Sequence, residues 1–159
     1  MGKYIICAGL SAVLALSLCA CGGGSGSSGD SVKTVDLEQL GADLVALCDE
    51  ELYQLDAETA AAVYEGVEAE EIVAWASSGA TANEVVLFRA KDEASADAIE
   101  ETMEVRLDDR EESYADYLPE EAAKLKEAVV EQEGVYVAVC VSPDPQQAEE
   151  LIDKALRAQ

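Results

Sequence analysis

The feature that most constrains the fold is a run of seven apolar residues near the end of the chain, Val135–Val141. Successive side chains of a strand point to opposite faces. One face then holds four valines, and the other holds Tyr136, Ala138 and Cys140. A strand that is apolar on both faces is typical of the middle of a sheet. We therefore expect a central strand here, at least partly covered on both sides.

Other short apolar runs predict the remaining strands. Residues 72–76 and 85–88 are rich in β-branched and aromatic side chains, and a segment containing Ser, Gly and Asn separates them. This pattern predicts an antiparallel hairpin. Val129 and Val130 precede the turn residues 132–134 and predict a second hairpin with the central strand.

Capping residues and apolar spacing predict the longer helices. Asp36, with Gln39 three residues on, opens a helix that we expect to run to about Leu52. Asp92 opens a long helix, which Pro119 interrupts.

Two further signals complete the helical pattern. Asp144 followed by Pro145 predicts the start of the last helix. Shorter helical segments are expected after Asp56, where Gly66 provides a stop, and around residues 122–125.

The elements predict a single α+β domain over residues 35–159. Their main order is α-β-β-α-β-β-α, which gives a mostly antiparallel four-stranded sheet with packed helices. A domain of this length buries an adequate core without a metal or a disulfide.

The start of the chain has the pattern of an export signal. Lys3 gives a positive charge, and residues 4–18 are apolar but too few to span a membrane. The sequence Leu18-Cys19-Ala20-Cys21 resembles a lipobox, which directs diacylglycerol to the thiol of its last cysteine and cleavage before it.

We therefore expect residues 1–20 to be a lipoprotein signal peptide. Residues 21–34 would be the lipidated Cys21 and a Gly/Ser tether. The alternatives are a plain secretory signal cleaved elsewhere and a retained amino-terminal anchor. The lipobox interpretation places the chain at the cell membrane, anchored by lipid on the extracytoplasmic face.

The charge balance limits the partners of the chain. Acidic residues number 34 against 10 basic ones, and the net charge is −24. Such a chain repels nucleic acid and anionic headgroups. Membrane attachment must therefore come from the diacylglycerol on Cys21, because two acyl chains anchor stably where one is marginal.

The chain contains no histidine. This excludes Ser-His-Asp and Cys-His nucleophile pairs and histidine zinc ligands. Paired carboxylates remain as the acidic groups of a cell-wall-directed hydrolase, because glycoside hydrolysis uses two of them. We expect no cofactor and no metal.

Two cysteines remain in the domain, Cys48 and Cys140. In an extracytoplasmic domain they could form a disulfide that closes a long loop. The alternative is two buried thiols that act as small apolar side chains.

The long helix carries a row of acidic residues at steps of four, namely Glu100, Glu104, Asp108 and Glu112. Like charges at this spacing are mildly destabilising. The row is either a solvated face or a weak cation site.

Two arginines, Arg106 and Arg110, lie one turn apart on the same helix. They either compensate local charge, for instance Arg106 with Asp109, or form a small anion site.

Several short segments resemble a known family. They are Val63-Tyr64-Glu65-Gly66, residues 82–88, Arg106 followed by Tyr114, and residues 134–137. With the lipobox, they resemble the DUF4358 family of Clostridia-type lipoproteins over residues 35–157. The resemblance implies a Gram-positive host and the outer leaflet of the plasma membrane, and it brings no reaction.

The resemblance also selects a candidate functional face, made of Asn83, Glu84, Arg106 and Tyr114. The sequence then favours a non-enzymatic, lipid-anchored binding or accessory module, with an envelope protein or a small ligand as partner. An accessory subunit would expose an apolar patch with a polar rim.

Overall fold

The computed structural model describes residues 34–157. The expected signal peptide and Cys21 lie outside them, as does the expected tether up to residue 33. The described part contains five helices and five strands. In chain order these are α1 (Leu37–Val45), β1 (Tyr53–Gln54), α2 (Ala57–Val63), β2 (Glu71–Ala76), β3 (Glu84–Arg89), α3 (Glu93–Ala115), α4 (Pro119–Lys126), β4 (Val129–Glu133), β5 (Tyr136–Val141) and α5 (Pro145–Arg157).

The five strands form one antiparallel sheet in the order β1-β2-β3-β5-β4. β2 and β3 form the first expected hairpin, and β4 and β5 form the second. The hairpins are joined because β3 pairs with β5, with Glu84 opposite Val141. The structure thus confirms a single α+β domain with an antiparallel sheet.

The expected four strands and the order α-β-β-α-β-β-α are wrong in detail. β1 adds a fifth strand at the edge of β2, with Tyr53 opposite Ala76 and Gln54 opposite Trp75. Two residues are too few for an alternation of apolar and polar side chains to show in the sequence. The short segments α2 and α4 are complete elements, so the order is α-β-α-β-β-α-α-β-β-α.

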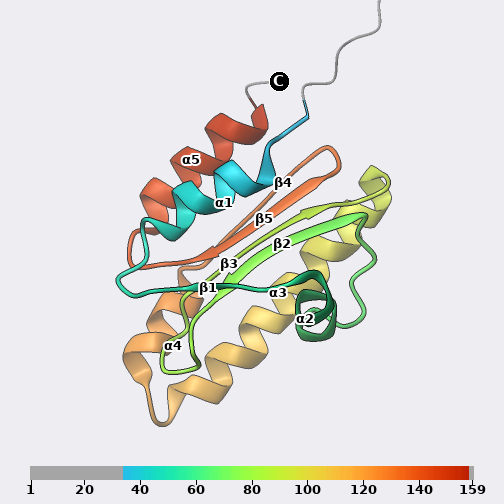
Figure 1. Cartoon of the computed structure of the whole chain (residues 1–159). Helices are drawn as coiled ribbons and strands as arrows, with labels where there is room; N and C mark the ends of the chain where they lie inside the picture. Colours follow the sequence, from blue (N-terminus) through green and yellow to red (C-terminus); the bar gives the residue numbers. More distant parts are fainter. Residues whose placement is uncertain (1–33, 158–159) are drawn as a thin grey trace, which may run out of the picture. The chain divides into compact units, whose positions relative to one another are not determined.

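Helices cover both faces of the sheet (Figure 1). α1 and α5 lie on one face, where Leu44, Trp75 and Ile152 belong to one apolar core. α2, α3 and α4 lie on the other face, where Met103 and Leu125 belong to a second core. β5 lies between β3 and β4 and is buried along its length, as the sequence predicts.

The side chains of β5 alternate between the two cores. Its three valines lie in the core under α3, while Tyr136, Ala138 and Cys140 lie in the core under α1 and α5. Val135 was expected with the other valines but packs on the α1–α5 side. It belongs to the turn beside Gly134, whose φ of +58° takes the chain out of strand geometry.

α1 ends at Val45 rather than near Leu52. The N–H of Leu47 bonds the carbonyl of Leu44 at 3.0 Å, which closes the helix in a tight turn. The acidic residues 49–51 follow, and they would lie unfavourably at the negative end of a longer helix. The turn releases the chain so that β1 reaches the edge of β2.

Aspartate side chains start the helices, as the capping patterns predict. Asp36, Asp56 and Asp92 each accept a hydrogen bond from the backbone N–H three residues on, at 3.0, 2.8 and 2.9 Å. Asp144 does the same for α5 at 3.1 Å. Local sequence therefore sets where these four helices begin.

Candidate functional site

The buried carboxylate of Glu84 is the centre of the site. Glu84 opens β3 and is only 2% exposed. Its Oε1 accepts hydrogen bonds from Tyr64 Oη at 2.8 Å and from Arg106 Nη1 at 2.7 Å, and its Oε2 accepts one from Arg110 Nη1. Three donors thus compensate a charge that would be costly to bury alone.

The two arginines reach Glu84 from one face of α3. They lie four residues apart, so their side chains are neighbours on the helix. Arg106 pairs with Glu84 in the part of the chain that the structure describes, so the expected pairing with Asp109 is wrong. Two guanidinium groups face one carboxylate, which leaves a net positive charge in this cluster.

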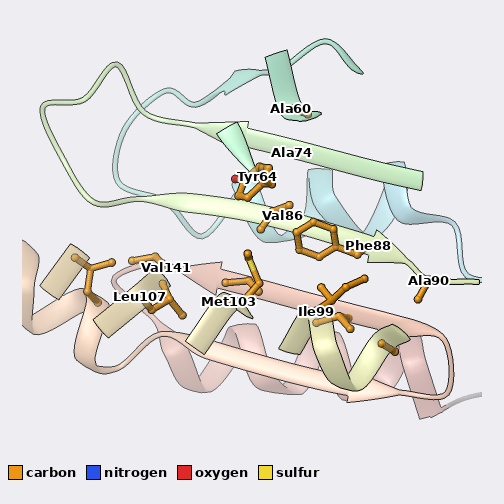
Figure 2. Close-up of a cluster of buried hydrophobic side chains, with 14 of the residues drawn as sticks. Ala60, Tyr64, Ala74, Val86, Phe88, Ala90, Ile99, Met103, Leu107 and Val141 are labelled. Carbon is orange, nitrogen blue, oxygen red and sulfur yellow. The ribbon is translucent and has the colours of Figure 1, made fainter. Parts of the chain in front are cut away.

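Tyr64 closes the cluster from the end of α2. Its ring meets Phe88 edge-on, with centroids 5.6 Å apart, and the Arg106 guanidinium lies 4.9 Å from the Tyr64 ring centre. Figure 2 shows this ring beside Val86 and Phe88. Burial, and then the negative charge of Glu84, raises the pKa of Tyr64, so its hydroxyl stays protonated and donates.

Asn83 forms a second polar cluster next to the first. It is 1% exposed; its Nδ2 donates to Asp49 Oδ1 at 2.5 Å, and its Oδ1 accepts from Lys124 Nζ at 3.1 Å. Lys124 Nζ also lies 3.0 Å from Glu121 Oε2. The hydrogen bond from Asn83, with help from Lys124, lowers the pKa of Asp49. Asn83 therefore connects the segment after α1 to α4.

Tyr114 holds the loop that leads into β3. Its hydroxyl donates to the Thr81 carbonyl at 3.3 Å, and its ring stacks on Tyr117 with centroids 5.6 Å apart. Glu121 Oε2 accepts from the Ala82 N–H at 2.7 Å. α3 and α4 together fix the start of β3 and hence the position of Glu84.

The structure thus brings the four residues Asn83, Glu84, Arg106 and Tyr114 together at the start of β3. No role could be predicted for Lys124 or Asp49, because each reaches Asn83 from a distant part of the chain, 41 and 34 residues away. Cys21, the expected lipidation site, lies outside the described residues. No helix within residues 34–157 has the length and apolarity needed to cross a membrane.

The two arginines that hold Glu84 also line an open groove between the end of α2 and α3. This hollow has a volume of about 370 Å³. Val63 and Val105 line it with 43% and 57% of their surfaces exposed. Two acidic residues, Glu65 and Asp109, line it as well. The groove therefore combines apolar surface with charges of both signs.

Cys48 and Cys140 are free thiols in the structure. Both belong to the α1–α5 side of the molecule, where Cys140 is buried and Cys48 is partly buried. Burial raises the pKa of Cys48 to about 11 and that of Cys140 to about 12. Both thiols therefore stay protonated at neutral pH and act as small apolar side chains.

The acidic row of α3 lies near an acidic residue of β4 as well as near solvent. Burial, and then the charges of Glu104, Asp97 and Glu131, raises the pKa of Glu100. Glu131 belongs to β4, so the row continues across to the sheet. Within residues 34–157, no group of three or more cysteine, aspartate or glutamate side chains is arranged to hold a metal ion.

We expect Glu100→Gln to raise the free energy of unfolding by a few tenths of a kcal/mol at about pH 7. The folded pKa of Glu100 is above its unfolded value, so stability linked to this group is lost as pH rises through the folded pKa. The gain should vanish at about pH 3, where the side chain is protonated in both states. Urea unfolding at the two pH values checks this, and an equal gain at both would contradict it.

The fold and the site define an α+β domain in which helices cover both faces of an antiparallel sheet. A buried cluster of one glutamate and two arginines joins β3 to α3. The chain belongs to the family described as "Domain of unknown function (DUF4358)", whose model matches residues 50–142. The match runs from β1 to β5 and includes Tyr64, Glu84, Arg106 and Arg110, whereas α1 and α5 lie outside it. Neither curated proteins nor solved structures give a significant match.

Proposed function

We propose that the chain is a lipid-anchored extracytoplasmic module that works by binding a ligand in the groove between α2 and α3. The observation that carries this proposal is the double role of Arg106 and Arg110. Each contacts the buried Glu84, and each also lines the groove with about a quarter of its side chain exposed, 24% and 23%. A rigid cationic wall beside exposed apolar side chains is typical of a ligand site.

The environment of Glu84 favours binding over hydrolysis by paired carboxylates. Both of its oxygens already accept hydrogen bonds from Tyr64 and the two arginines. A hydrolytic carboxylate must instead face the scissile bond or the attacking water. Glu84 therefore acts as the anchor that positions the arginines.

Membrane attachment is proposed to come from diacylglycerol on Cys21, in the sequence Leu18-Cys19-Ala20-Cys21. The acidic charge of the chain supports this route, because a net −24 offers no attraction to anionic headgroups. A lipid anchor would hold the groove close to the outer face of the membrane, where it would meet small ligands or an envelope protein.

We expect Cys21→Ala to release the chain from membranes. Without that thiol no diacylglycerol can be attached, so the full chain should lose fatty-acid label and move from the detergent phase to the aqueous phase. Cys19→Ala is the matched control, because it removes a neighbouring thiol and should keep label and anchoring. Metabolic labelling with a fatty acid and detergent phase separation, in a bacterial host that lipidates proteins, measure both properties.

Two outcomes would contradict the lipoprotein proposal. If the unaltered chain remains in the membrane without label, the leader is a retained anchor. If the unaltered chain is released without label, the leader is a plain secretory signal.

A further inference from the structure

We propose that the groove between α2 and α3 binds a small zwitterion, namely an amino acid or dipeptide with a short apolar side chain. This inference rests on the proposed binding function and names its ligand class.

The charges that line the groove are balanced, unlike those of the whole chain. Acidic residues outnumber basic ones by 34 to 10, yet two of the four arginines of the chain lie here, with Glu65 and Asp109. A ligand with only negative charge would face these two carboxylates, and one with only positive charge would face the two arginines. A zwitterion can place each charge against its opposite.

Arg106 is the group best placed to take the ligand carboxylate. A guanidinium has five N–H donors. In the described part of the chain, Arg106 bonds Glu84 through Nη1 alone, whereas Arg110 bonds Glu84 through Nη1 and the Ala82 carbonyl through Nη2. Arg106 therefore retains Nη2 and Nε for a ligand. Its contacts with Glu84 and Tyr64 hold it in place, which lowers the ordering cost of binding.

Asp109 and Glu65 are the groups that would receive the ammonium group of the ligand. Both side chains are exposed and line the same hollow as Arg106. Asp109 lies three residues from Arg106 on α3, so the two groups are neighbours on the helix. Opposite charges at this spacing match the short separation between the carboxylate and ammonium groups of an amino acid.

The size and apolar lining of the groove select the side chain of the ligand. The volume of about 370 Å³ lies at the low end of ligand pockets, which span roughly 300–1,000 Å³. Val63 and Val105 offer exposed aliphatic surface. A short apolar side chain would cover this surface and be stabilised by the apolar area that it removes from water.

Titration calorimetry of the full lipidated chain in detergent micelles tests the ligand class with four probes. L-valine and L-alanyl-L-alanine carry both charges, whereas N-acetyl-L-valine carries only the negative one and L-valinamide only the positive one. We expect saturable binding of both zwitterions, and at least about tenfold weaker binding of each singly charged probe.

Substitution of Asp109 tests the assignment of the ammonium end. Asp109→Asn should weaken binding of L-valine by about tenfold, and it should not weaken binding of N-acetyl-L-valine, which has no ammonium group for Asp109 to contact. Asp108→Asn is the matched control, because it removes the same charge from the adjacent residue, which lines a different hollow. It should leave both affinities unchanged. Equal urea midpoints for the two variants check that the fold is intact.

The ligand proposal is overturned if neither zwitterion binds at about 10 mM, if all four probes bind equally, or if the two variants weaken L-valine equally. These failures are separate from failure of membrane anchoring, because the fatty-acid label on Cys21 is measured independently. A labelled, anchored chain that binds no zwitterion rejects the ligand class and retains the lipoprotein.

Discussion

Glu84→Gln is expected to lower the free energy of unfolding by about 3 kcal/mol. The substitution keeps the shape of the side chain and removes its charge. Arg106 and Arg110 then lose their carboxylate partner, and each is only about a quarter exposed, at 24% and 23%. Because water reaches part of each guanidinium, the cost should lie at the lower end for broken buried pairs.

Urea unfolding of the full chain measures this effect, with the m-value as a check for two-state behaviour. Glu71→Gln is the matched control, because Glu71 pairs with Arg89 at 3.1 Å but is 45% exposed. An exposed pair contributes little, so the control should change the free energy of unfolding by less than about 1 kcal/mol. Equal losses for both variants would show that burial of Glu84 does not set the cost.

The cluster of Glu84 with Arg106 and Arg110 could be predicted from the sequence only in part. The spacing of Arg106 and Arg110 indicates a shared helix face, because residues four apart lie one turn apart on a helix. Their acceptor lies 22 and 26 residues away and is reached only when α3 packs on the sheet. The family resemblance pointed to Glu84 and Arg106, but nothing in their spacing paired them.

The fold shows the same division between local and distant information. The central position of β5 follows from its own residues, and the helix starts follow from aspartates three residues from their partners. β1 forms because Tyr53 and Gln54 pair with the edge of β2. No local sequence pattern predicts this pairing. The early end of α1 has the same origin, since the chain leaves the helix in order to reach that edge.

The cluster around Asn83 was the hardest part of the site to predict. Asn83 joins Asp49 and Lys124, which lie 34 and 41 residues away in opposite directions along the chain. A polar residue before a strand is ordinarily interpreted as a turn residue. Its burial at 1% exposed, with partners from two other segments, is a property of the packed structure alone.

Gly41→Ala is expected to lower the free energy of unfolding by about 1–3 kcal/mol, although alanine is the better helix former. Gly41 lies inside α1, where alanine would ordinarily gain about 1 kcal/mol. A Cβ at this position would lie closer than 3.0 Å to Cζ3 and Cη2 of Trp75, a spacing that real Cβ atoms essentially never show. Trp75 is only 8% exposed, so its ring has little room to move away.

A double-mutant cycle in urea unfolding identifies the cause. Trp75→Leu removes the ring atoms that the new methyl group would meet, so Gly41→Ala should cost much less in that background. With the clash relieved, the helix propensity of alanine should decide the sign, and the substitution should become neutral or stabilising. A cost that is the same in both backgrounds would mean that α1 does not need glycine for its approach to β2.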